Sequence, residues 1–167
     1  MKRLVKLGLL LTASALLSAC GGGAQTDEAD SDAAVGAAEG DGLSAFEREH
    51  GIGPITQPVE LGDPDPALAS AGEQIFNMKC TACHRVEERY IGPPLANVLV
   101  RRSPAYTMNM MMNPTEMTQR HPVAKALLAE YLAPMPFQDL TEQDARALVE
   151  YLRTFADSSS APQEPAS

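Results

Sequence analysis

Two cysteines and a histidine stand close together near the middle of the chain, in the order Cys80-Thr81-Ala82-Cys83-His84. Two thiols at this spacing near a helix end can add across the two vinyl groups of one porphyrin. The adjacent imidazole then lies under the iron as an axial ligand. The sequence therefore predicts one covalently attached haem c, bound through Cys80 and Cys83, with His84 on the iron.

Three other chemistries are open to the same residues. A zinc site would need two more ligands, and His50 and His121 are the histidines outside the motif. A thioredoxin-like dithiol would need a βαβ context, which the sequence lacks, and a disulfide would be permitted outside the cytoplasm. The histidine directly after the second cysteine and the export signal favour haem. We expect His50 in an exposed position, and His121 at a helix start before Pro122.

The second axial ligand must come from elsewhere in the chain, and Met135 is the predicted one. It stands between Pro134 and Pro136, which exclude a regular helix and favour extended backbone. A short, stiff loop of this kind can hold a thioether over the iron. Met78 is too close to the motif to cross the ring. The remaining methionines beyond the motif crowd one predicted helical region: Met108, Met110, Met111, Met112 and Met117. The spacing of Met108, Met111 and Met112 is typical of a packed helix face.

The N-terminus has the pattern of an export signal, with three basic residues ahead of an apolar run over residues 7–17. The run is too short for a transmembrane helix, which needs about 20 residues. The Leu-Ser-Ala-Cys sequence that ends at Cys20 resembles the lipobox of bacterial lipoproteins. We therefore expect residues 1–19 to be a signal peptide and Cys20 to be lipidated. The alternative is an ordinary signal peptide with a spare thiol.

Composition and charge limit the class of partner. The chain has 167 residues, with 13 Lys and Arg against 22 Asp and Glu, for a formal charge of −9. The predicted signal peptide removes three basic residues and no acidic ones, which leaves 10 against 22, or −12. An acidic chain without a basic block is a poor candidate for binding nucleic acid.

The domain organisation follows from composition. Residues 20–42 contain the lipidation site, a Gly-rich start and six acidic residues without Lys or Arg, so we expect a flexible linker. Residues 43–157 form the predicted folded domain, in which 43–64 is an irregular arm. Residues 158–167 are expected to be a disordered tail.

The folded region has the signals of an all-α domain of about four to six helices, because no segment alternates with period two. The predicted helices begin at residues that favour helix N-termini. These are Asp65 with Pro66, Ser103 with Pro104, Pro122, and Thr141 with Asp144. A domain of this size with few aromatic residues has a modest core, which a large apolar cofactor would complete.

Residues 65–157 resemble class I monohaem cytochromes c, and with the N-terminus they resemble the membrane-anchored lipoprotein type of bacteria. Gly72 and Phe76 match the point where the family's N-terminal helix crosses its C-terminal helix. The other side of that crossing would be Leu148, Tyr151 and Leu152.

The loop Gly92-Pro93-Pro94-Leu95 matches the family's loop after the haem motif. The resemblance implies that the Pro93 carbonyl accepts a hydrogen bond from the His84 ring and that Leu95 packs on the haem.

The resemblance implies an electron-transfer protein and not an enzyme, because an iron held by His84 and Met135 has no open position. We expect a lipid-anchored, periplasmic monomer that takes electrons from a quinol-oxidising complex and passes them to a haem–copper terminal oxidase. One alternative is a donor to a periplasmic nitrogen-oxide reductase. Another is a haem sensor or small peroxidase in which Met135 is displaceable or absent.

Basic residues near the motif form either a docking face for an acidic partner or a solvated charged face. They are Lys79, Arg85, Arg89, Arg101 and Arg102.

Overall fold

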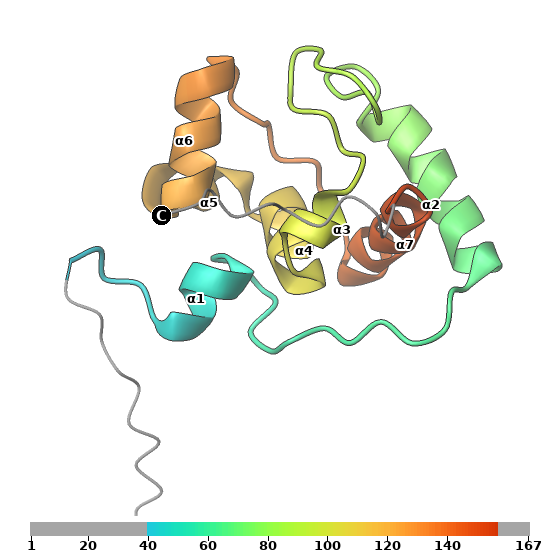
Figure 1. The fold of residues 1–167 in the computed structure, drawn as a ribbon, viewed down its shortest axis with the longest axis horizontal. Helices are drawn as coiled ribbons and strands as arrows, with labels where there is room; N and C mark the ends of the chain where they lie inside the picture. Colours follow the sequence, from blue (N-terminus) through green and yellow to red (C-terminus); the bar gives the residue numbers. More distant parts are fainter. Residues whose placement is uncertain (1–39, 157–167) are drawn as a thin grey trace, which may run out of the picture. The chain divides into compact units, whose positions relative to one another are not determined.

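Helices make up all the regular structure in the computed structural model, which describes residues 40–156 (Figure 1). The all-α class is therefore confirmed for this range. The described residues belong to one of the chain's two compact units, residues 34–167. The predicted signal peptide, Cys20, nearly all of the predicted linker, and the predicted tail lie outside the described residues. The helices are α1 (Ala45–His50), α2 (Pro66–Lys79), α3 (Val98–Arg101), α4 (Pro104–Met112), α5 (Pro114–Arg120), α6 (Pro122–Tyr131) and α7 (Glu142–Arg153).

All four predicted helix starts are confirmed, and each has a side-chain cap. The Asp65 carboxylate accepts hydrogen bonds from the amides of Ala67 and Leu68 at the start of α2. The other capping pairs are the Ser103 hydroxyl with the amide of Tyr106, the His121 ring with the amide of Val123, and the Thr141–Asp144 capping box. These local bonds stabilise the first turn of each helix, which explains why the sequence could reveal the starts.

The prediction of an irregular arm over residues 43–64 is wrong for its first part, because Ala45–His50 form α1. Ser44 and Glu47 make a reciprocal capping box there. His50 is also not exposed as expected, because its side chain retains only 13% of its accessible surface and its Nδ1 lies 2.8 Å from the Ser103 hydroxyl.

Two further helices bring the number in residues 40–156 to seven, above the expected four to six. Asn113 ends α4, and Pro114 then occupies the first turn of a new helix, α5. Proline suits that position because the amide it lacks has no partner inside the helix. The other addition is α3, a single turn after Asn97, whose φ of 58° is left-handed.

The crossing of α2 and α7 is the main helix contact of the core, as the resemblance implies. Gly72 lies so close to α7 that a Cβ there would be 2.0 Å from the carbonyl oxygen of Ala147. Phe76 packs on the ring of Tyr151 with centroids 5.3 Å apart, and Leu148 is fully buried. The absence of a side chain at Gly72 therefore permits the close approach on which the rest of the core depends.

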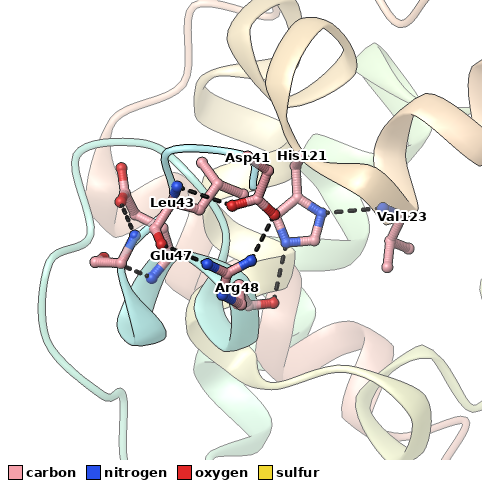
Figure 2. Close-up of polar contacts among 7 residues, drawn as sticks. Asp41, Leu43, Glu47, Arg48, His121 and Val123 are labelled. Atoms are coloured by element: carbon pink, nitrogen blue, oxygen red, sulfur yellow. Dashed lines mark hydrogen bonds and ion pairs between the residues drawn. The ribbon is translucent and has the colours of Figure 1, made fainter. Parts of the chain in front are cut away.

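A second cluster of buried residues joins the N-terminal arm to α4, α5 and α6. The buried Asn109 side chain binds the arm at several points: its amide nitrogen donates to the carbonyls of His50 and Ile55, and its oxygen accepts from the Ile55 amide. Figure 2 shows a further contact, in which His121 Nε2 lies 3.1 Å from the Arg48 carbonyl oxygen while Nδ1 accepts from Val123. The arm is thus a bound part of the domain.

Candidate haem site

A cavity of about 510 Å³ opens between the loop after α2, helices α4 and α6, and the connection from α6 to α7. Its walls are mostly apolar and include Phe76, Leu95, Val98, Leu128 and Leu148. Figure 1 shows the loop after α2 and the α6–α7 connection on the same side of α4. The volume and apolar lining are those of a site for a cofactor or other bulky ligand.

The cavity brings together all the residues predicted to bind the haem. Cys80, Cys83 and His84 line it from the end of α2, and Met135 lines it from the α6–α7 connection. These residues come from segments about fifty positions apart in the chain, so only the tertiary fold places them around one space. The two residues predicted to support them, Pro93 and Leu95, line the same cavity.

The cysteine motif forms a tight turn directly after α2. Cys80 ends the helix with its amide bonded to the Phe76 carbonyl, at 2.9 Å. Its own carbonyl accepts hydrogen bonds from the amides of Cys83 and His84, at 3.0 and 2.9 Å. These hydrogen bonds therefore hold the backbones of the two cysteines and the histidine in one turn. Both cysteine side chains are half-buried, and no disulfide joins them.

Burial also controls the protonation of the first thiol. It raises the pKa of Cys80 to about 11, while the neighbouring Lys79 ammonium opposes the shift. The Cys80 sulfur is therefore protonated at neutral pH for as long as no covalent bond is made to it.

The His84 ring is oriented by the loop that follows the motif. Its Nδ1 lies 3.1 Å from the carbonyl oxygen of Pro93, the contact that the resemblance implies. Burial lowers the pKa of His84, and the Pro93 carbonyl opposes this effect. A neutral ring that donates Nδ1–H to a carbonyl has the lone pair of Nε2 available for a metal.

Gly92 is a site residue whose role the sequence analysis missed. A Cβ at this position would lie 2.5 Å from Cε1 of His84 and 2.9 Å from Nδ1. The imidazole therefore packs directly on the Gly92 backbone. A glycine beside a proline indicates only a loop, and no local pattern connects it to the histidine ring.

The connection that carries Met135 is tied to the end of α2. The Lys79 ammonium donates a hydrogen bond of 2.9 Å to the Gln138 carbonyl. Met135 itself is half-buried and packs against the core cluster of α2, α4 and α7. The position of its thioether is therefore set by the main core.

The other methionines beyond the motif differ in whether they line the cavity. Met110 and Met111 also line the cavity, whereas Met108, Met112 and Met117 are not among its lining residues. Met117 has a different contact, since its sulfur accepts a hydrogen bond from the Ile52 amide at 3.1 Å. Only two of the five alternatives thus share the cavity with Met135.

The rival zinc site lacks support from the two remaining histidines. Neither His50 nor His121 lines the cavity, and each is bonded to a partner elsewhere in the domain. Within residues 40–156, no three or more His, Cys, Asp or Glu side chains gather where they could hold a metal ion.

Of the five basic residues near the motif, some line the cavity and others do not. Lys79, Arg101 and Arg102 line the cavity. Arg85 instead bonds the carbonyl of Thr81 and lies over the ring of Tyr90, and Arg89 pairs with Glu130 at 2.7 Å. No aspartate or glutamate is among the cavity-lining residues, although the chain as a whole is acidic.

These features fit a haem attached through two thioethers, and comparison with known proteins gives the family. Residues 69–156 match the model of the family described as cytochrome c. The chain therefore belongs to the cytochrome c family, and its domain is a class I monohaem domain that binds haem c covalently through Cys80 and Cys83. Proteins of this family are typically electron-transfer proteins.

Individual relatives resemble most of the described region. Cytochrome c-551 of Stutzerimonas stutzeri is 30% identical over 92 residues, which are 52% of this chain and 79% of that protein. The structure of a cytochrome c from Rhodothermus marinus is similar with a TM-score of 0.63 and 53% identity, covering 66% of this chain and 95% of that one. An engineered form of that cytochrome, Rma TDE, gives a TM-score of 0.62 and 52% identity over 66% and 96% of the two chains.

Proposed function

We propose that this protein is a membrane-tethered carrier of single electrons, with His84 and Met135 as the two axial ligands of its haem iron. The observation that carries the proposal is that both side chains line the cavity that contains the two attachment cysteines. Haem c supplies an iron that changes between two oxidation states. The protein residues hold that iron, keep other ligands away from it and set its potential.

His84 is suited to its proposed role by its surroundings. Its contact with Pro93 fixes the tautomer, and burial favours the neutral imidazole that a metal requires. Gly92 packs against the ring from the same loop. The ligand is thus pre-oriented, so little rearrangement of this side chain accompanies electron transfer.

Met135 is suited to its role by a restrained backbone. The flanking prolines limit the conformations of the segment, and the Lys79–Gln138 hydrogen bond ties it to the end of α2. Thioether ligation with burial favours Fe(II) and raises the potential. With both axial positions taken, the iron has no place for dioxygen or a substrate.

The partners are proposed from the resemblance and the N-terminal sequence. The electron donor would be a quinol-oxidising membrane complex, and the acceptor a haem–copper terminal oxidase. A lipid on Cys20 would hold the domain at the extracytoplasmic face of the membrane, where tethering gives a high effective concentration without tight binding. Among residues 40–156 no helix is both long and apolar enough to cross a bilayer.

The test is stopped-flow oxidation of the reduced protein by isolated membranes. We expect rapid oxidation that stops with an inhibitor of the haem–copper oxidase. Oxidation that instead stops with an inhibitor of nitrogen-oxide reductases would replace the acceptor with such a reductase. If neither the oxidase nor a nitrogen-oxide reductase in the membranes oxidised the protein, and the ferric form bound cyanide or peroxide tightly, the electron-carrier proposal would be wrong. The protein would then be a haem sensor or peroxidase.

A further inference from the structure

We propose that Arg89 is a positioning residue for the Met135 ligand. Its side chain holds the end of α6 against the loop that follows the haem motif, and this contact limits the rate at which Met135 leaves the iron. The inference rests on the proposed function, because it takes Met135 as the second axial ligand.

Residues 133–138, which we call the Met135 segment, have few bonds of their own. They belong to no helix, and in residues 40–156 none of them takes part in a hydrogen bond between two backbone groups. The segment lies between Leu132, whose φ is 55°, and Asp139, whose φ is 50°. This left-handed conformation is unfavourable for residues that carry a Cβ. The backbone of the segment is therefore held in place by side chains of other elements.

Arg89 makes three contacts with the end of α6, directly before the Met135 segment. Its guanidinium donates hydrogen bonds to the Glu130 carboxylate at 2.7 Å and to the Glu130 backbone carbonyl at 3.2 Å. The same group lies over the Tyr131 ring, 4.0 Å from the ring centroid. An isolated exposed ion pair contributes little, but a planar guanidinium that bonds two oxygens and stacks on a ring holds its partners in one geometry.

Two cationic side chains connect the segment to the part of the chain that carries the histidine ligand. Lys79, directly before the attachment motif, bonds the Gln138 carbonyl at the far end of the segment. Arg89 binds next to the near end, and it comes from the loop between His84 and Pro93. The two sides of the cavity are therefore joined directly, by contacts at both ends of the segment.

The Arg89 contact lies at the surface, so it can open while the core stays folded. The side chains of Arg89 and Glu130 retain 55% and 54% of their accessible surface. Opening releases the end of α6 and the left-handed turn at Leu132, and Met135 can then move away from the iron. The iron–sulfur bond breaks in this event and no electron is transferred. The contact therefore acts on the rate of ligand loss.

Exchange of the ligand for imidazole measures this event directly. In the ferric holoprotein, imidazole forms an iron–nitrogen bond after the iron–sulfur bond of Met135 has broken. At saturating imidazole, the rate at which the sulfur-to-iron absorption band disappears is the rate at which Met135 leaves. We expect Arg89→Ala to raise this rate about three- to tenfold, the combined effect of losing an exposed ion pair and a cation–π contact. Equal rates in Arg89→Ala and the unmodified protein would overturn the proposal.

Two further variants separate positioning from a general effect on the fold. Arg89→Lys keeps the charge but not the planar group that reaches both Glu130 oxygens and the ring, so we expect an intermediate rate. Arg120→Ala is the matched control, because it breaks an ion pair with Glu116 whose side chains are similarly exposed, at 43% and 41%. Neither residue of that pair is among the cavity-lining residues, so the rate should stay unchanged. An equal rise in Arg120→Ala, or a rise in Arg89→Ala explained by a lower midpoint of denaturant unfolding, would overturn the proposal.

Salt gives a test that needs no variant. We expect Met135 to leave faster in the unmodified protein as the ionic strength is raised, because salt screens exposed ion pairs. Imidazole is used at a pH where it is neutral, so its own encounter with the protein does not depend on salt. A rate that is independent of salt would overturn the proposal.

The same spectra distinguish this inference from the proposed axial ligation. If the ferric protein lacks the band, or if Met135→Ala retains it, Met135 is not the ligand and the inference fails together with the proposed function. If the band depends on Met135 but disappears no faster in Arg89→Ala than in Arg120→Ala, the role of Arg89 is wrong and the ligation by Met135 stands.

Discussion

The orientation of the His84 ring depends on a residue that has no side chain. The ring lies where a Cβ of Gly92 would project, at 2.5 Å from Cε1. The neighbouring Pro93 carbonyl lies 3.1 Å from Nδ1 on the same ring. One short loop therefore both makes room for the imidazole and fixes its rotation.

Replacing Gly92 with alanine should displace the His84 ring and weaken its contact with Pro93. We expect a lower yield of haem-loaded protein, and a ferric electron paramagnetic resonance spectrum that contains a high-spin fraction. Gly62→Ala is the matched control, because a Cβ there would meet nothing within 4 Å. A normal, fully low-spin spectrum in Gly92→Ala would show that the loop is not needed to position the histidine.

At this scale the sequence predicted residues whose chemistry is local and missed those that depend on the fold. The Cys80–His84 motif and the proline-flanked Met135 have a meaning within a few positions of the chain. Gly92 matters through its close approach to the His84 ring, which is visible only in the folded loop. Glycine is common in loops, so its residue type alone did not distinguish it.

Helix starts were predictable because capping is a local interaction, whereas the shortest helices were not. The six residues of α1 are too few to be stable alone, since isolated helices shorter than about 12–15 residues are marginal. The Ser44–Glu47 capping box is the local signal in the sequence that marks its start. The helix is retained by tertiary contacts of the arm, above all those of Asn109.

Asn109→Ala should release the N-terminal arm from α4. The substitution removes the partners of the Ile55 amide and carbonyl and of the His50 carbonyl. Each buried polar group left unsatisfied costs about 1–3 kcal/mol. We expect the Ile55 amide to lose most of its protection from hydrogen exchange, measured by NMR. Asn77→Ala, at an exposed position of α2, should leave that protection unchanged; equal protection in both variants would contradict the role given to Asn109.

The capping box of α7 should contribute stability that depends on pH. Hydrogen bonds from the Thr141 hydroxyl and amide lower the pKa of Asp144 below its ordinary value of 3.8. A lowered carboxyl pKa stabilises the folded state above pH 3.8, and that contribution is lost as the pH falls through the folded-state value. Asp144→Ala should therefore cost about 1 kcal/mol at neutral pH and progressively less below pH 3.8.

Denaturant unfolding at pH 7 and pH 3 would measure this difference. Glu142→Ala is the control, because Glu142 is exposed in the same helical turn and takes no part in the capping box. A loss of stability in Asp144→Ala that is the same at both pH values would show that the ionised carboxylate is not what stabilises the helix.

For the molecule as a whole, the distribution of charge differs sharply between the site and the rest of the chain. The formal charge is −9, yet the cavity is lined by Lys79, Arg101 and Arg102 without a carboxylate. The sequence predicted that basic residues gather near the motif, but it could not separate these from Arg85 and Arg89. Which basic residues line the cavity depends on the direction that each side chain takes in the folded domain.

The proposed tether gives a prediction about the location of the protein. Cys20→Ser should remove the site of lipid attachment, so the protein should move from the membrane pellet to the periplasmic fraction. Haem content and spectrum should stay unchanged, because Cys20 is remote in sequence from the haem motif. Fractionation followed by haem staining would measure this. A Cys20→Ser protein that remained in the membrane pellet after salt washing would contradict anchoring by this residue.

The proposed axial ligation by Met135, on the α6–α7 connection, is the point on which the electron-carrier account most depends. The decisive measurement is the sulfur-to-iron charge-transfer band at the red edge of the ferric spectrum, recorded for the unmodified protein and for methionine variants. We predict that the band is present, that Met135→Ala abolishes it and lowers the reduction potential, and that Met110→Ala and Met111→Ala retain it. A band that survived in Met135→Ala, or disappeared in one of the other two variants, would contradict the account.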